Sequence, residues 1–185
     1  MQTKNSRSNQ RVRLTMRLFQ ESLMALLQEK NIEQISVTEL CEKAELNRTT
    51  FYLHYGQPMD VLNEMETSLL EDTRSFVETL DIKTKLENNL THVFAYIRDN
   101  QERFSLLVFR NGRDVFRQAY LENIMNCLIP QLLSEYAHND AYFYSYLTSG
   151  CFAVVFNWAK AGYKTPPKEL SQIICKYSRK LLAPD

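Results

Sequence analysis

Apolar residues recur every three or four positions along most of this chain, which is the spacing that places them on one face of an α-helix. Residues that favour helix ends or starts lie between these stripes, as Asn31, Pro58, Gly112 and Pro166 do. The pattern predicts an all-α protein with helices over 11–30, 36–44, 48–55, 58–80, 86–97, 102–109, 114–136, 142–161 and 168–182. Pro130 can kink the 114–136 helix or divide it into two.

Two of the predicted helices are short and adjacent, and a tight turn joins them. The first opens at Ser36, whose hydroxyl can cap free backbone N–H groups while Glu39 reaches back to complete a capping box. Residues 45–47 form the turn, and Asn47 can cap the second helix. This layout is typical of a helix-turn-helix DNA-binding protein.

The second helix of this pair has an apolar face and an outward face. Phe51 and Tyr55 lie on the apolar face. The outward side chains are those of Arg48, Thr49, Tyr52 and Leu53. Arginine can bond both acceptors of a guanine, a threonine methyl can touch a thymine methyl, and hydroxyls reach phosphates. Alternatively, this is an ordinary amphipathic helix whose polar face lies in water. The first helix of the pair, directly before it, favours DNA contact over that alternative.

These residues also carry a family resemblance. Phe51-Tyr52-Leu53-His54-Tyr55 resembles the FYxHF signature of the TetR/AcrR family of bacterial transcriptional regulators, and ISVTELCEKAELNRTT before it is similar to the family's lead-in. The resemblance covers residues 10–65 well, and the remainder is similar in length and helical character. It implies a three-helix DNA-binding domain over 1–56 and a helical effector-binding and dimerisation domain over 57–185, with a linking helix at 57–80.

The resemblance implies roles for individual positions of the signature region. Bases would be contacted by Arg48, Thr49 and Thr50, and phosphates by Tyr52 and His54. The full set of candidate DNA-binding residues is Thr38, Asn47, Arg48, Thr49, Thr50, Tyr52, Leu53 and His54. This chain departs from the family pattern at Glu45, where glycine is common, and at 56–58, where a phosphate-binding lysine often follows. A negative charge at Glu45 predicts that nonspecific DNA binding is not very tight.

The resemblance further implies a repressor that binds DNA as a dimer and is released by a small-molecule effector. A recognition helix this short makes few base contacts, so the predicted operator is an inverted repeat bound by a homodimer. Residues 142–161 are apolar on several sides, and we expect 139–182 to pair with its copy as a four-helix bundle. Alternatively, these helices only close the monomer core. The other functional interpretation is a helical partner-binding protein, or a co-activator acting through another regulator.

Aromatic residues of the second domain are candidates for an effector pocket. They are Phe94, Phe104, Phe109, Phe116, Tyr120, Tyr146, Phe152 and Phe156, with His92 or Arg113 as polar anchors. Aromatic residues at helical spacing more often belong to a core than to a ligand site, so both interpretations remain open.

The charge of the chain is balanced overall but uneven along it. The net charge is zero, yet five basic residues precede Glu21, the first acidic residue: Lys4, Arg7, Arg11, Arg13 and Arg17. This basic patch suits a nucleic-acid partner. Residues 1–10 are polar and are expected to be disordered in isolation, and they can enter a minor groove or only keep the chain soluble.

Other function classes find little support in the sequence. No apolar run approaches the roughly 18 residues of a membrane span, and the polar start does not suit a secretory signal, so we expect a cytoplasmic protein without a membrane partner. The four cysteines, Cys41, Cys127, Cys151 and Cys175, form no C-x-x-C pair and suit buried reduced thiols better than redox sensing. No phosphate loop, nucleophile elbow or zinc motif is present, so we expect no enzyme activity, cofactor or metal.

Overall fold

The computed structural model describes residues 3–81, 85–110, 116–120, 122–123 and 141–182 of the chain. Every regular element in these ranges is helical, which confirms the predicted all-α class. Contacts divide the chain into two compact units, Met1–Leu69 and Leu70–Asp185. No helix within the described ranges has both the length and the apolar character needed to cross a membrane.

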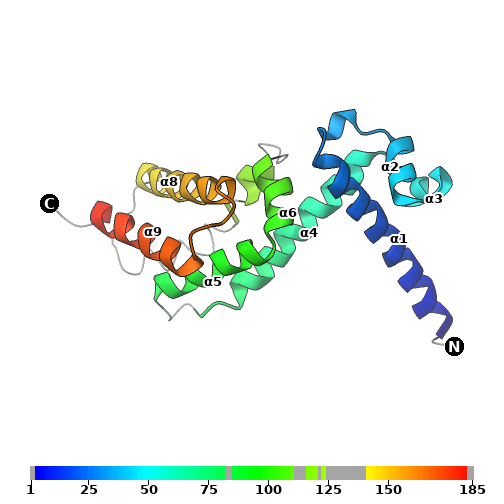
Figure 1. Cartoon of the computed structure of the whole chain (residues 1–185). Coiled ribbons are helices and arrows are strands. Elements are labelled where there is room, and N and C mark those ends of the chain that lie inside the picture. The colour runs from blue at the N-terminus through cyan, green and yellow to red at the C-terminus, as the bar shows by residue number, and fades with distance from the viewer. Residues whose placement is uncertain (1–2, 82–84, 111–115, 121, 124–140, 183–185) are drawn as a thin grey trace. The chain divides into compact units, whose positions relative to one another are not determined.

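The first unit contains the predicted pair of short helices. Its elements are α1 (Thr3–Leu27), the 3-10 turn η1 (Ile32–Gln34), α2 (Val37–Ala44), α3 (Arg48–Tyr52) and the beginning of α4 (Pro58–Glu78) (Figure 1). The expectation that residues 1–10 are disordered is wrong for 3–10, which continue α1. The physical reason is that no glycine or proline interrupts Thr3–Leu27, so its backbone hydrogen bonds can extend to the end.

The core of the first unit holds the recognition segment in place. Phe19 of α1 and Phe51 of α3 are both fully buried. Their rings meet edge to face with centroids 5.3 Å apart. Leu40 of α2 and Leu62 of α4 are also fully buried, so all four helices contribute to this core. Burying Phe51 directs the opposite face of α3 outward.

The second unit begins with the remainder of α4. Its further elements are α5 (Leu86–Asp99), α6 (Gln101–Phe104), η2 (Ser105–Arg110), a short helical stretch at 116–120, α8 (Ala141–Lys160) and α9 (Pro167–Leu182). Helices α5 and α9 pack side by side, and α8 also contacts α9 (Figure 1). Most of the predicted 114–136 helix, including Pro130, lies outside the described residues.

The helix predicted over 102–109 differs in the structure. It consists of α6 followed by η2, a π-helix. Leu106, Leu107 and Val108 are three successive buried residues. An α-helix would spread them around much of its circumference, whereas the wider π-helical turn keeps them on a broader buried face. Apolar spacing alone does not reveal this change of helix type.

Candidate DNA-binding surface and internal cavity

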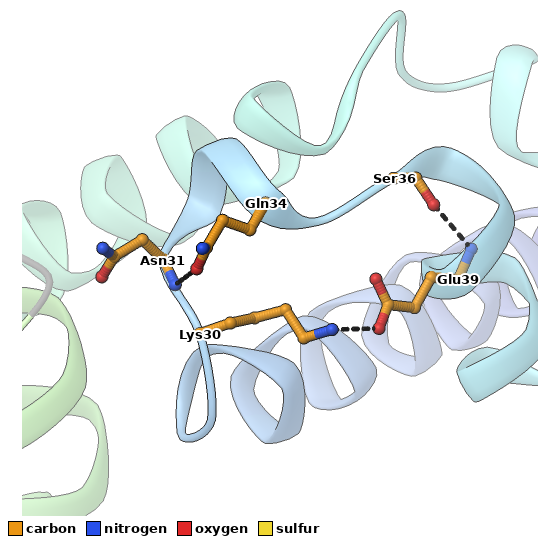
Figure 2. A network of polar contacts seen from close by, with 5 residues as sticks. All are labelled: Lys30, Asn31, Gln34, Ser36 and Glu39. Atoms are coloured by element: carbon orange, nitrogen blue, oxygen red, sulfur yellow. Dashed lines mark hydrogen bonds and ion pairs between the residues drawn. The ribbon is translucent and has the colours of Figure 1, made fainter.

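The start of α2 is fixed by two polar contacts (Figure 2). The Ser36 hydroxyl accepts a 3.2 Å hydrogen bond from the backbone N–H of Glu39, as predicted. The other half of the predicted capping box is wrong, because the Glu39 carboxylate instead receives a 2.5 Å hydrogen bond from Lys30 Nζ. This ion pair joins the turn that follows α1 to the first turn of α2. The side-chain-to-backbone hydrogen bond of a capping box occurs instead at η1, where the Gln34 side chain accepts a 3.1 Å hydrogen bond from the backbone N–H of Asn31.

The turn between α2 and α3 has an unusual backbone at its first residue. Glu45 adopts the left-handed conformation, with φ 55° and ψ 34°. Leu46 N–H then bonds back to the Cys41 carbonyl at 3.0 Å, which closes the end of α2. Side chains other than glycine are strained in this conformation by roughly 1–2 kcal/mol. The turn therefore keeps the geometry that glycine favours although it carries glutamate.

The start of α3 is capped by Asn47. Its Oδ1 accepts 2.7 Å and 2.8 Å hydrogen bonds from the backbone N–H and the hydroxyl of Thr50. These two candidate DNA-binding residues thus bind each other. The cap sets the direction in which the short helix leaves the turn.

The outward face of α3 gathers the remaining candidates on one surface. Arg48, Thr49, Tyr52, Leu53 and His54 are exposed, and 75% of Leu53 is accessible. The Arg48 guanidinium donates a hydrogen bond to the Thr38 hydroxyl of α2, which brings these two candidates together. We name the set Thr38, Arg48, Thr49, Tyr52, Leu53 and His54 the α3 outer face. It combines a cation, two aliphatic hydroxyls and apolar groups, the chemistry that base edges and phosphates accept.

One contact behind this face was not predicted. The α-helix ends at Tyr52 rather than at Tyr55. The Tyr55 hydroxyl donates a 2.5 Å hydrogen bond to the carboxylate of Glu64 on α4. Burial raises the pKa of Tyr55 above its ordinary value of 10.0, and the hydrogen bond to Glu64 raises it further. Glu64 therefore anchors the end of the signature to α4, and no local pattern marks it.

The second unit contains a partly open cavity of about 90 Å³. Its walls come from α5, α6, η2, Tyr120, α8 and α9. The predicted effector candidates that line it are Phe94, Phe104, Phe109, Tyr120 and Phe152. Residues that the sequence did not single out also line it, including Leu86, Val108, Leu147, Cys151 and Ser178.

Other effector candidates are not part of the cavity wall. His92 is exposed on α5. Phe116 packs against the ring of Tyr120 with centroids 6.1 Å apart, and Phe156 lies beside Phe109 at 5.9 Å. Tyr146 lines a surface groove between α8 and α9. Arg113 lies outside the described residues.

The cavity wall is bonded to α4 within the second unit. Tyr120 is buried, and its hydroxyl donates a 3.2 Å hydrogen bond to the hydroxyl of Thr73 on α4. Burial raises the pKa of Tyr120 above its ordinary value of 10.0. Beside it, Tyr96 of α5 stacks on Phe76 of α4 with ring centroids 4.4 Å apart. Side chains near the cavity are thus fixed to the C-terminal half of α4.

The described cysteines, Cys41, Cys151 and Cys175, form no disulfide bond with one another. Burial raises the pKa of Cys41 and raises that of Cys151 to about 11, so both are neutral thiols near pH 7. Cys127 lies outside the described residues. Among the residues that the structure describes, no cluster of acidic, histidine or cysteine side chains could hold a metal ion.

Comparison with known proteins shows which family this chain matches and which solved structures share its fold. Residues 84–180, more than half of the chain, match the TetR-type model described as a transcriptional regulator C-terminal region. The uncharacterized HTH-type transcriptional regulator YxbF of Bacillus subtilis (strain 168) is 28% identical over 165 residues. That alignment covers 82% of this chain and 41% of YxbF, so the chain spans less than half the length of this relative.

Solved structures share the fold. A TetR transcriptional regulator from Streptococcus agalactiae 2603V matches with a TM-score of 0.71 at 20% identity, over 97% of this chain and 99% of that chain. Thermus thermophilus FadR, a TetR family repressor solved with lauroyl-CoA, matches with a TM-score of 0.50 at 18% identity, over 87% and 91% of the two chains. At these identities the likeness establishes the fold alone.

The fold and the α3 outer face define a helix-turn-helix protein with a second, helical unit. The match over 84–180 gives the family: the chain belongs to the TetR family of transcriptional regulators. This confirms the family resemblance of the signature region. The members of this family are regulators and not enzymes.

Proposed function

We propose that this protein is a sequence-specific DNA-binding repressor that binds an inverted-repeat operator as a homodimer and is released by a small molecule. The observation that carries the proposal is the α3 outer face, where Arg48 and Thr38 are joined while buried Phe51 fixes the helix behind them. The side chains on that face match base and phosphate chemistry in a major groove. Arg48, Thr49 and Thr50 would contact bases, and Tyr52 and His54 phosphates.

The surface of α8 and α9 supports the homodimer. Tyr142, Tyr146 and Tyr177 are 88%, 66% and 58% exposed, which is unusual for large aromatic side chains unless another surface covers them. Between these helices runs a groove that includes Gly150 and Val154. A Cβ added at Gly150 would meet no atom within 4 Å, so a helix of a second subunit has room to approach there. A dimer through 139–182 would present two α3 outer faces to the two halves of an operator.

Helix α4 supports a route from effector to DNA. It contributes residues to both units, with Glu64 bonded to Tyr55 in the first and Thr73 bonded to Tyr120 in the second. A ligand that displaces Tyr120 would shift Thr73, and a continuous helix would carry that shift to Glu64. The ligand would occupy the cavity, where Phe94, Phe104, Phe109 and Phe152 also lie. The TetR family repressor of Thermus thermophilus, solved with lauroyl-CoA, is a neighbour in which a ligand is bound.

The proposal is tested by selecting bound duplexes from a random library with the purified whole protein at about physiological salt, where nonspecific phosphate attraction is partly screened. We expect one inverted repeat with half-sites about 34–36 Å apart. A folded, dimeric preparation that selects no sequence would contradict the proposal. That result would favour the second candidate, a partner-binding protein or co-activator, which the exposed apolar side chains of Tyr52 and Leu53 could serve.

A further inference from the structure

The side chain of Arg48 is fixed at both of its ends. Arg48 is the first residue of α3, and the cap made by Asn47 fixes the backbone from which its side chain leaves. At the other end, the guanidinium donates a hydrogen bond to the Thr38 hydroxyl of α2. An arginine side chain has several rotatable bonds and is mobile when nothing holds it. This exposed arginine is instead held across the turn that joins the two helices.

A second observation places the charge of Arg48 beside α2. Cys41 lies three residues after Thr38, on the same side of α2. Burial raises the pKa of Cys41, whereas the positive charge of Arg48 acts to lower it. A charge has such an effect on a thiol only from nearby. The guanidinium therefore lies near α2 and does not extend straight into solvent.

The Thr38 hydroxyl is itself held in a defined position. Thr38 is in the first turn of α2, between the capping residue Ser36 and Glu39. Ser36 accepts the backbone N–H of Glu39, and the Glu39 carboxylate binds Lys30 (Figure 2). These contacts fix the first turn of α2 on both sides of Thr38. Its hydroxyl is therefore a well-placed acceptor for Arg48.

The partner of Arg48 is a neutral hydroxyl and not a carboxylate. Arg17, Arg74 and Arg103, in contrast, form ion pairs with acidic side chains. A hydrogen bond to a hydroxyl orients the guanidinium without neutralising its charge. The guanidinium carries five N–H donors, so one bond to Thr38 leaves donors for both acceptors of a guanine. Arg48 can therefore keep this bond while it contacts a base.

We propose that Thr38 is a specificity-determining residue that acts through Arg48, because its hydroxyl holds the guanidinium in the orientation that bonds both acceptors of a guanine before DNA binds. This inference rests on the proposed function and deepens it. A side chain that is already oriented loses less conformational entropy on binding, and its donors fit one base pair better than the others. The other role open to Thr38, a direct bond to a phosphate, would add affinity without sequence preference.

The test uses the whole protein and the duplex that the wild type selects from a random library. The base pair at which Arg48→Ala loses its preference is replaced by each of the other three pairs. Thr38→Val and Thr38→Ala both remove the hydroxyl, and Thr38→Ser keeps it. We expect the first two to reduce the preference for that base pair by roughly fivefold, the factor for one net hydrogen bond, and Thr38→Ser to retain it. Thr67→Val, the same change at an exposed threonine of α4, is the matched control and should also retain the preference.

A duplex of shuffled sequence separates positioning from phosphate contact. Its affinity should be the same for Thr38→Val and the wild type. Equal weakening of Thr38→Val on the shuffled and selected duplexes would assign Thr38 to a phosphate and overturn the proposal. An unchanged base preference in Thr38→Val would overturn it as well. In an Arg48→Ala background, Thr38→Val should have no further effect at that base pair, and a further loss would show that Thr38 acts independently of Arg48.

A measurement without DNA tests the contact itself. The heteronuclear NOE of the Arg48 Nε–H group reports its motion on the picosecond to nanosecond scale, and Arg48→Ala identifies the signal by its disappearance. We expect an ordered group in the wild type and in Thr38→Ser, and a mobile one in Thr38→Val. Equal NOE values for Thr38→Val and the wild type would overturn the proposal. Because no DNA is present, this result distinguishes a failed contact between Thr38 and Arg48 from a failure of DNA recognition.

Discussion

The hydroxyl of Tyr55 bonds to the carboxylate of Glu64 across 2.5 Å, so the last residue of the signature is fixed to α4. Both side chains are partly buried, and a hydrogen bond to a charged group in such a place contributes more than one between neutral groups. This contact makes the position of α3 depend on α4.

Replacing Tyr55 by Phe should therefore lower the free energy of unfolding by about 1–2 kcal/mol, because Glu64 then lacks its donor. DNA affinity should fall as well, since the end of the recognition segment is no longer fixed. Urea unfolding and DNA titration measure the two effects. Tyr52→Phe, which alters an exposed hydroxyl, is the control for stability. A Tyr55→Phe protein as stable as the wild type would show that the hydrogen bond contributes nothing to the free energy of unfolding.

Replacing Glu45 by Gly should stabilise the protein by about 0.5–1 kcal/mol, because glycine adopts the φ of 55° without strain. The change also removes a negative charge near the proposed DNA surface, so nonspecific DNA affinity should rise. Glu45→Ala separates the two causes, since it removes the charge but keeps the Cβ. Only the glycine variant should show the higher urea midpoint, and both should bind DNA more tightly. Equal stability of the two variants would refute the account of strain.

Replacing Asn47 by Ala should cost about 1–2 kcal/mol of stability, because the backbone N–H of Thr50 loses its acceptor. Asn47→Asp keeps an acceptor oxygen and places a negative charge at a helix N-terminus, so it should retain the stability. Thermal unfolding distinguishes the variants. If Asn47→Asp is as unstable as Asn47→Ala, capping is not the role of this residue.

Alkaline pH should destabilise the protein through Tyr120. Its raised pKa means that the folded state holds the phenolic proton more tightly than the unfolded state does. This contribution to stability is complete below about pH 10 and is lost as the pH rises above that value. Tyr120→Phe should reduce the loss by up to about 1.4 kcal/mol per pH unit. Urea midpoints at about pH 9 and pH 11 measure it, with Tyr52→Phe as the exposed control. If the urea midpoint falls by the same amount between these two pH values in Tyr120→Phe and in the wild type, the prediction is contradicted.

Features of the fold that depend on neighbours in sequence could be predicted from the sequence. Asn47 caps α3 and Ser36 caps α2 because each acts on a backbone N–H three residues away. The burial of Phe51 follows from helical spacing in the same way. The family signature adds the division into an N-terminal helix-turn-helix part and a C-terminal helical part, which no single helix encodes.

Contacts between distant residues escaped prediction for a physical reason. Glu39 is a suitable partner for Ser36, but the Lys30 ammonium lies within reach in the folded chain and attracts the carboxylate more strongly. The cavity is a product of several helices, so the spacing of aromatic residues cannot separate Phe94, in its wall, from Phe156, beside it.

The most direct test of DNA recognition repeats the selection from a random duplex library with Arg48→Ala. Its control is Lys164→Ala, which removes the same charge from an exposed site in the second unit. The wild type and the control should select the same inverted repeat. Arg48→Ala should lose preference at one base pair of each half-site, at a cost of roughly 1–3 kcal/mol. An unchanged sequence preference for Arg48→Ala would contradict the proposal that the α3 outer face reads the operator through this residue.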